Sequence, residues 1–233
     1  MQKLIFQILM ICPILLFSQS DFEIGKKLFV QGNYASAKPI LENVIKETPN
    51  HLTALEYLGD IEGNNKSWDK AMEYYGKLIA LKPTEANYHY KYGGCLGMKA
   101  KESSKFKALG MIDDVKGCFE KAIQLNPNHI EARWALIELY LQLPGIVGGS
   151  EKKAQRYANE LAKISPVDFY LAKGRIAEYF NRYKEAERNY KLAIEIGGSK
   201  TTYQKLANLY KHKMNQPEKA KLLLETYKEK TNP

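Results

Sequence analysis

The sequence has few of the residues that usually carry catalysis or hold metal ions. Its 233 residues include four histidines and three cysteines. The spacings His-Glu-x-x-His, Cys-x-x-Cys and Gly-x-Ser-x-Gly, which mark zinc, redox and serine-hydrolase sites, do not occur in it. His51 and His129 each follow a Pro-Asn pair where a helix is expected to begin, so both read as helix-boundary residues. We predict that the chain is not an enzyme and has no metal site and no cofactor.

Two segments resemble ligand sites only superficially. Residues 145–152 contain the glycines of a phosphate loop, but they lack its Gly-Lys-Ser/Thr order and follow a predicted helix rather than a strand. Asp113 and Asp114 are adjacent acids, but neighbouring residues of a helix point about 100° apart. A solvated helix start explains this pair better than a cation site does.

Long hydrophobic runs are also scarce, and the sequence contains one, from Leu4 to Phe17. A lysine precedes this run and small polar residues follow it, which predicts a secretory signal peptide over residues 1–20 that is cleaved after Ser20. The run is shorter than the roughly 20 residues that a membrane span needs, although an uncleaved anchor remains the alternative. We therefore expect an exported protein, periplasmic or secreted, whose residues 21–233 form the working domain.

Cysteine is too rare for a disulfide framework of the kind that stabilises many exported proteins. Cys12 lies inside the apolar run, and Ile11 before it argues against a lipoprotein site, which needs a small residue there. Cys95 and Cys118 fall on paired helices of one repeat. A single disulfide and two small buried thiols both fit them.

What the sequence does contain is a period of 34 residues. This spacing separates Gly25, Gly59 and Gly93, and it also separates Ala37 from Ala71 and Pro49 from Pro83. A fixed period between about 20 and 50 residues is typical of arrays in which small structural units stack in a line. The period therefore points to a repeat architecture, and to binding rather than chemistry.

Each unit is predicted to be a pair of helices. The apolar residues follow helical spacing in two stripes, which are Ile24, Gly25 and Leu28, then Tyr34, Ala37, Leu41, Val44 and Ile45. Gly32-Asn33 separates the stripes, because both residues tolerate a left-handed backbone. We predict that the stripes face each other as a hairpin. In the second unit, Gly59 should lie opposite Ala71, where small side chains let the helix backbones approach closely.

These residues resemble the tetratricopeptide repeat. The best matches are Leu55, Leu58-Gly59, Trp68, Ala71, Tyr75 and Pro83, and later Tyr170, Gly174, Tyr183, Ala186, Tyr190 and Ala193. The resemblance implies an all-α fold, a right-handed superhelical solenoid of about six helical hairpins. The approximate repeats are residues 21–50, 51–84, 85–128, 129–166, 167–199 and 200–233.

Two repeats are longer than the period. Pro83 to Pro127 spans 44 residues, ten too many, and the excess lies in residues 99–110. This segment has helical character, so we expect extended helices or a short extra turn. Pro127 to Pro166 spans 39 residues, five too many. The excess there is the glycine-rich stretch 143–150, a predicted rigid turn in which Ser150 caps a helix over residues 151–164.

Positive charge is concentrated at the end of the chain. The formal net charge is +9, and residues 200–233 alone hold eight lysines and three glutamates. A solvated outer face on the last helices explains these lysines. The alternative is a subunit that binds a cell-envelope polymer or anionic lipid through this lysine-rich end. We expect no nucleic-acid partner, because arginine is scarce and no nucleic-acid motif is present. Membrane contact remains open, but not as an integral protein after processing.

The resemblance also implies where a partner binds. In this family, the first helices of successive repeats line a concave groove that holds an extended peptide or a partner helix. The groove candidates are Tyr57, Asp60, Asn64, Tyr90, Trp134, Glu138, Arg175, Tyr179 and Asn208, with Glu56, Lys91, Leu141 and Leu171 on the same helical faces. Large rings beside mixed charges are enriched at binding hot spots. Some of these rings could instead belong to the core. The sequence thus predicts a non-catalytic scaffold for a protein or peptide partner.

Overall fold

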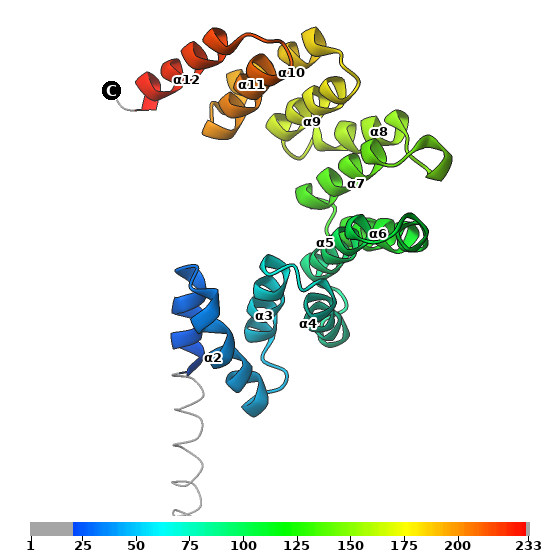
Figure 1. Cartoon of the computed structure of the whole chain (residues 1–233), viewed down its shortest axis with the longest axis vertical. Coiled ribbons are helices and arrows are strands. Elements are labelled where there is room, and N and C mark those ends of the chain that lie inside the picture. The colour runs from blue at the N-terminus through cyan, green and yellow to red at the C-terminus, as the bar shows by residue number, and fades with distance from the viewer. Residues whose placement is uncertain (1–20, 232–233) are drawn as a thin grey trace, which may run out of the picture. The chain divides into compact units, whose positions relative to one another are not determined.

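A computed structural model describes residues 21–231 and contains helices but no strand in that range. The predicted signal peptide and Cys12 lie outside the described residues. A helix covers residues 21–30, and those that follow are α2 (Tyr34–Glu47), α3 (Leu52–Asn64), α4 (Trp68–Leu81), α5 (Ala86–Glu102), α6 (Lys105–Leu125), α7 (Ile130–Gln142), α8 (Glu151–Leu161), α9 (Pro166–Tyr179), α10 (Tyr183–Gly197), α11 (Lys200–His212) and α12 (Pro217–Thr231). Figure 1 shows these helices. The predicted all-α repeat fold is confirmed.

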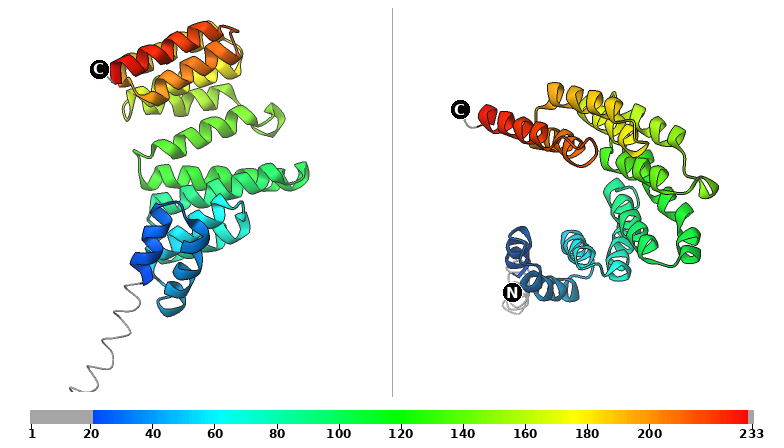
Figure 2. Two further views of the ribbon diagram at one scale, coloured as in Figure 1. Left: turned by 60° about the vertical axis from the view of Figure 1, so that its left-hand side comes forward. Right: turned by 45° about the horizontal axis from the view of Figure 1, so that its top comes forward.

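The described helices form two compact units that divide between Leu125 and Asn126, here called the N-terminal unit (residues 21–125) and the C-terminal unit (residues 126–231). Within each unit, consecutive helices pack together. The pairs α3–α4 and α5–α6 do so in the first unit, and α7–α8, α9–α10 and α11–α12 in the second. Figure 2 shows from two further directions that the paired helices run antiparallel. The repeating element in both units is therefore a helical hairpin.

Local sequence signals define where the helices begin. The Nδ1 atom of His51 accepts a hydrogen bond from the Ala54 backbone N–H at 3.2 Å, and that of His129 accepts one from Ala132 at 3.3 Å. Each histidine is the N-cap of its helix, as predicted from the preceding Pro-Asn pair. Both imidazoles therefore serve the fold.

Close packing inside two of the hairpins, α3–α4 and α9–α10, depends on a glycine under a tyrosine ring. A Cβ atom added to Gly59 would lie 2.8 Å from the Tyr75 ring, and one added to Gly174 would lie 2.4 Å from the Tyr190 ring. The Tyr75 ring supplies the three atoms nearest to the Cβ added at Gly59, so this ring covers the glycine, which the sequence did not predict. Ala71 is nevertheless fully buried in the same hairpin.

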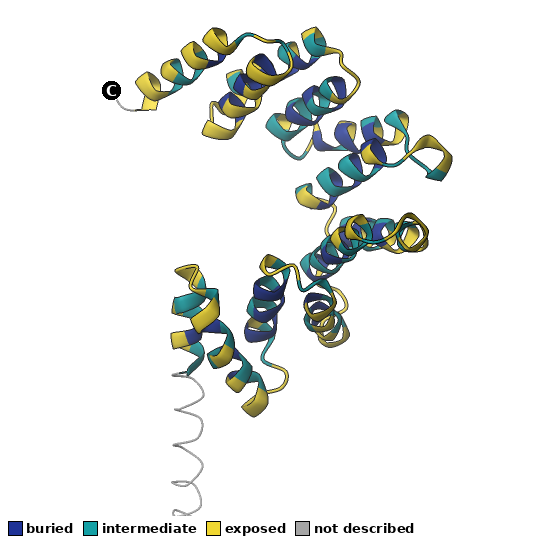
Figure 3. Cartoon of the chain, viewed as in Figure 1, coloured by how far each residue is buried: buried dark blue, intermediate teal, exposed yellow. Residues whose placement is uncertain are grey.

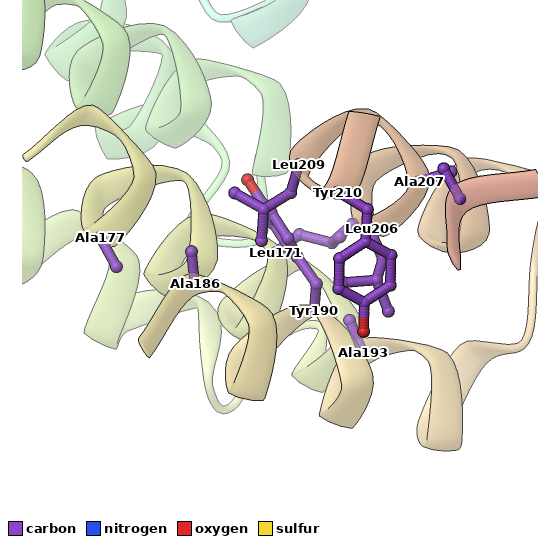
Figure 4. Packing of buried hydrophobic residues seen from close by; sticks show 10 residues of the cluster. Leu171, Ala177, Ala186, Tyr190, Ala193, Leu206, Ala207, Leu209 and Tyr210 are labelled. Carbon is purple, nitrogen blue, oxygen red and sulfur yellow. The ribbon is translucent and has the colours of Figure 1, made fainter. Parts of the chain in front are cut away.

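Buried side chains lie on the helix faces that meet, and exposed ones lie on the outer faces and turns (Figure 3). In the C-terminal unit the core includes Leu171, Tyr190 and Leu209, which come from α9, α10 and α11. Figure 4 shows these side chains gathered between the three helices, with the Tyr210 ring reaching toward Ala193. One hydrophobic cluster thus joins successive hairpins of this unit.

The two insertions have the forms expected from the sequence. α5 and α6 are 17 and 21 residues long, so the ten extra residues extend both helices. The second insertion is a turn with a short 3-10 helix, Gly145–Val147. The Oγ of Ser150 then accepts a hydrogen bond from the Lys153 N–H at 3.2 Å and caps α8. That helix ends at Leu161, three residues before the predicted end.

Other sequence-based expectations are resolved in the described residues. Cys95 and Cys118 are free thiols, so the disulfide alternative does not hold here. Asp113 and Asp114 are exposed in the middle of α6, so the predicted helix start at this pair was wrong. Among residues 21–231, no helix combines the length and apolar character that crossing a membrane requires.

Candidate binding surface on the first helices

In the N-terminal unit, a polar network joins the first helices of two hairpins. The Lys91 ammonium on α5 lies 2.8 Å from Glu56 Oε1 and 2.8 Å from Asp60 Oδ2, both on α3. The Tyr75 hydroxyl on α4 donates to Asp60 Oδ1 at 2.5 Å. Asp60 therefore accepts hydrogen bonds from its own hairpin and from the next one.

This network is held in one protonation state. Burial raises the pKa of Tyr75, and the neighbouring Asp60 carboxylate raises it further. Burial alone would lower the pKa of Lys91, but hydrogen bonds to Asp60 and Glu56 outweigh it and the pKa is raised. The phenol thus stays neutral and the ammonium stays charged at neutral pH. Asp60 has a structural role here, whatever it offers to a ligand.

The other candidates in this unit differ in exposure. Tyr57 is half-buried and stacks on the Phe29 ring at a centroid distance of 4.1 Å. Asn64 is exposed, and its side-chain amide donates to the Asp60 carbonyl at 2.8 Å. Tyr90 is half-buried, with its ring centroid 5.9 Å from that of Phe119. The two rings therefore pack within the fold and present only part of their surface.

In the C-terminal unit, the first helices lie side by side, since α7 contacts α9 and α9 contacts α11. The Arg175 guanidinium on α9 donates two hydrogen bonds to the Glu138 carboxylate on α7, at 2.7 and 2.9 Å. The same guanidinium lies 5.6 Å from the centre of the Tyr179 ring. Two-point Arg–carboxylate pairs fix orientation as well as charge. We call this surface the α7–α9–α11 face.

The candidate residues of this face differ in how far their side chains are exposed to solvent. The Trp134 indole N–H donates to Asp168 Oδ1 at 2.8 Å, and its ring packs against the hydrophobic cluster. Tyr179 is 41% exposed, and Asn208 is also exposed. Leu141 and Leu171 are buried in the core, so their predicted place on the open face was wrong.

Two clefts in the C-terminal unit were not predicted from the sequence. The larger, of about 1100 Å³, lies along α8 and includes five cations and one carboxylate, Glu160, among its lining residues. The cations are Arg133, Lys152, Lys153, Arg156 and Lys163. A cleft with this imbalance favours an anionic ligand.

The smaller cleft, of about 600 Å³, is lined by residues of α10, the loop between α11 and α12, and the start of α12. Within it, Glu187 accepts hydrogen bonds from the Tyr210 hydroxyl at 2.7 Å and the Lys219 ammonium at 3.1 Å. Burial would raise the pKa of Glu187, but these bonds and that of Lys191, at 2.8 Å, hold it at about 2. Glu187 therefore neutralises part of the lysine-rich end.

A signal in the sequence could have identified several of these contacts. The bond from Trp68 to Glu102 and that from Trp134 to Asp168 each join residues 34 positions apart. Lys91 is 35 positions from Glu56. Donors and acceptors one period apart therefore mark the places where successive hairpins bond to each other.

Comparisons with known proteins show which proteins have a similar architecture. Family models described as the tetratricopeptide repeat match residues 22–86 and 167–196. No curated protein sequence matches the chain. A thermophilic tetratricopeptide repeat protein from Thermus thermophilus has a similar structure, with a TM-score of 0.66 at 17% identity, covering 82% of this chain and 98% of that one.

Two further solved structures have the same fold. PilW, a widely conserved type IV pilus biogenesis factor, has a TM-score of 0.64 at 16% identity, covering 91% of this chain and 92% of its own. YrrB, described as a repeat protein with an unusual peptide-binding site, has a TM-score of 0.52 at 15% identity, covering 78% and 87%. At these identities the likeness concerns the fold alone.

Proposed function

Since the chain belongs to the tetratricopeptide repeat family, we propose that it is a non-catalytic scaffold that binds an extended peptide or a partner helix on the α7–α9–α11 face. The observation that carries this proposal is the arrangement of Tyr179 beside the Arg175–Glu138 pair. Tyrosine and arginine are two of the residue types enriched at binding hot spots.

The Arg175–Glu138 pair supports the proposal because it orders the face before a ligand arrives. Arg175 lies between the Glu138 carboxylate and the Tyr179 ring, and the side chains of the ion pair are 27% and 33% exposed. A surface that is already ordered loses less side-chain entropy on binding. The edges of the pair and the ring stay available to a peptide backbone.

The solved relatives are consistent with this role. YrrB shares the fold and is described as having a peptide-binding site. At this identity the binding residues of YrrB cannot be carried over to this chain. The assignment to Tyr179, Arg175 and Asn208 therefore rests on this chain alone. The candidates of the N-terminal unit, Tyr57 and Tyr90 among them, present less open surface, and the proposal does not rest on them.

A display library of random peptides tests the proposal. Peptides selected on the purified protein should bind Tyr179→Ala roughly tenfold to a hundredfold more weakly, as expected for loss of an aromatic anchor. Leu222→Ala is the control, because Leu222 is 65% exposed but lies on α12, a second helix. Equal affinity of the selected peptides for wild type and Tyr179→Ala would exclude this face as the site.

A second candidate function is binding of an anionic cell-envelope polymer or lipid through the lysine-rich end. The cleft of about 600 Å³ favours it, because Lys184, Arg188 and Lys191 line it near the exposed lysines of α12. Such binding should weaken steeply between about 50 and 300 mM salt. Substituting Lys211, Lys213, Lys221 and Lys228 with glutamine should abolish polymer binding and leave peptide binding intact.

We also propose that residues 1–20 direct export and are removed after Ser20. Mass spectrometry of the protein purified from its producing cells measures the mature N-terminus directly. A chain beginning at Asp21 supports a periplasmic or secreted protein. A chain that still begins at Met1 and fractionates with membranes would identify the segment as an anchor.

A further inference from the structure

The N-terminal unit has one hairpin tip that differs from the others. Residues 98–111, here called the α5–α6 tip, carry the ten-residue insertion and form the ends of two long helices. The tip extends past the other helices of its unit in the left view of Figure 2. By contrast, the α3–α4 turn of the same unit is the polar sequence Asn65-Lys66-Ser67.

The tip exposes large apolar side chains. Phe106 is 89% exposed, and Leu109, one helical turn further along α6, is 45% exposed. A single exposed apolar residue is ordinary, but full exposure of a phenylalanine is not. The second insertion, in the C-terminal unit, carries Ile146, which is 96% exposed. The two most exposed large apolar residues described in the chain thus lie in its two insertions.

Positive charge surrounds the exposed ring. The tip contains four lysines and one acid, Glu102. Lys99 pairs with Asp69, whereas Lys101, Lys105 and Lys107 are exposed and form no ion pair within residues 21–231. Lys105 and Lys107 directly flank Phe106. The Glu102 carboxylate accepts a hydrogen bond from the Trp68 indole at 2.6 Å, so it belongs to the base of the tip.

From these observations we propose that the α5–α6 tip docks on an anionic lipid surface, with Phe106 inserted among the headgroups. The two clefts described above are lined by residues of the C-terminal unit, so neither of them holds a peptide side chain beside the Phe106 ring. The ring can, however, enter a soft interface while its flanking lysines stay at headgroup level. Anionic lipids attract such lysines, and each lysine near the surface adds about 1 kcal/mol to the free energy of binding. The exposed ring and the unpaired lysines would then bind the same ligand, the anionic lipid surface.

The proposed contact between the tip and the lipid surface is expected to be weak. One inserted aromatic ring and three lysines are comparable to a single acyl chain, which gives marginal and reversible membrane binding. The tip therefore fits a protein that visits a surface and releases it. It is also distinct from the lysine-rich end of α12, which lies in the other unit.

Vesicle sedimentation tests the proposal. The purified protein is mixed with vesicles of phosphatidylcholine alone or with about a third phosphatidylglycerol, at low salt. We expect binding to the anionic vesicles, reduced roughly tenfold by Phe106→Asp and roughly a hundredfold by replacing Lys101, Lys105 and Lys107 with glutamine. Phe106→Trp should preserve binding, and the new indole should show a blue-shifted emission when vesicles are added.

Matched variants control the experiment. Val30→Asp changes another apolar residue of the same unit, 74% exposed, and should bind as wild type does. Glutamine at Lys46, Lys70 and Lys77, three exposed lysines of the same unit that lie outside the tip, should also leave binding unchanged. The proposal is overturned if the protein binds no anionic vesicles, or if Phe106→Asp and the tip lysine variant bind as wild type does. It is also overturned if Phe106→Asp instead dissociates a self-associated form that light scattering detects.

Discussion

In both units, a tyrosine–carboxylate hydrogen bond joins the two helices of a hairpin, and an ion pair joins that hairpin to a neighbouring one. The two units differ in which carboxylates accept these bonds. In the N-terminal unit, Asp60 accepts from both the Tyr75 hydroxyl and the Lys91 ammonium. In the C-terminal unit, the Tyr190 hydroxyl donates to Glu178 at 2.8 Å, and Arg175 pairs with Glu138 instead. In the first unit Asp60 takes part in both bonds, with Glu56 as a second acceptor for Lys91, whereas in the second unit two different carboxylates accept them.

This difference has a consequence for stability. A shared acceptor couples closure of a hairpin to its attachment to the next hairpin, because its loss breaks both bonds together. Separate acceptors keep the two functions independent. The α7–α9 link can therefore change its partners without loosening the α9–α10 hairpin, which suits a face that binds a ligand.

The largest effect should come from the glycines under the tyrosine rings. Gly59→Leu should cost about 3 kcal/mol, and Gly174→Leu more, because added atoms would overlap a buried ring in each hairpin. In linear repeats, such a loss spreads to neighbouring units. Thermal unfolding measures it. Gly94→Ala is the control, since nothing lies within 4 Å of its added Cβ and alanine favours a helix. An unchanged melting temperature for Gly174→Leu would mean that the hairpin packing is misassigned.

The next effect distinguishes the shared acceptor from the separate ones. Asp60→Ala should cost about 2 kcal/mol, because it leaves the Tyr75 hydroxyl, on a buried ring, without its partner and also breaks the bond to Lys91. Glu138→Ala should cost about 1 kcal/mol, since it breaks one partly exposed ion pair. Urea unfolding gives both values. Equal costs would remove the distinction between the units.

These two predictions also indicate what sequence reasoning can reach. The 34-residue spacing of Gly25, Gly59 and Gly93 predicted a repeat array, and the apolar stripes on either side of Gly32-Asn33 predicted helical hairpins, because helical spacing and helix-breaking residues are properties of short segments. These patterns did not place Tyr75 over Gly59, since the crossing point of two helices depends on how all their side chains pack. The same limit explains Leu171, which was assigned to the open face but is buried in a core cluster that also includes Leu206 and Leu209 of the next hairpin.

The candidate site shows a similar division. Arg175 and Glu138 were found as polar residues of the first helices, but their pairing needs the register between hairpins. Trp134 was a groove candidate whose ring could equally have belonged to the core, and its bond to Asp168 joins it to a residue 34 positions away. The nine candidates were chosen because they lie on one helical face. That criterion predicts which side chains are exposed, but not which side chains they bond to.

A smaller effect concerns acid stability in the C-terminal unit. The pKa of Glu187 is held at about 2, below its ordinary value of 4.5. Because the folded pKa is the lower one, the stabilisation is complete above about pH 4.5 and is lost as the pH falls toward 2. Lys191 and Lys219 are about half exposed, so solvent screening reduces the contribution to about 1 kcal/mol. The difference in unfolding free energy between wild type and Glu187→Gln should shrink over this range. A constant difference would contradict the assignment.

The smallest effect is on thiol reactivity in the N-terminal unit. Burial, aided by Asp60, raises the pKa of Cys95 to about 11, so this thiol should alkylate slowly at pH 8. Asp60→Asn should accelerate labelling of Cys95 several-fold and leave Cys118 unchanged, because it removes a negative charge near Cys95 alone. Peptide mass spectrometry resolves the two sites. Faster labelling of both would indicate local unfolding instead.

The measurement that tests the central claim most directly is site-specific photo-crosslinking in the cells that produce the protein. A benzophenone side chain is placed at Tyr179 on the α7–α9–α11 face, at Lys163 in the α8 cleft, or at Lys228 on α12. The scaffold account predicts a discrete protein adduct from position 179 and none from the other two. An adduct from position 163 or 228, with none from 179, would contradict it.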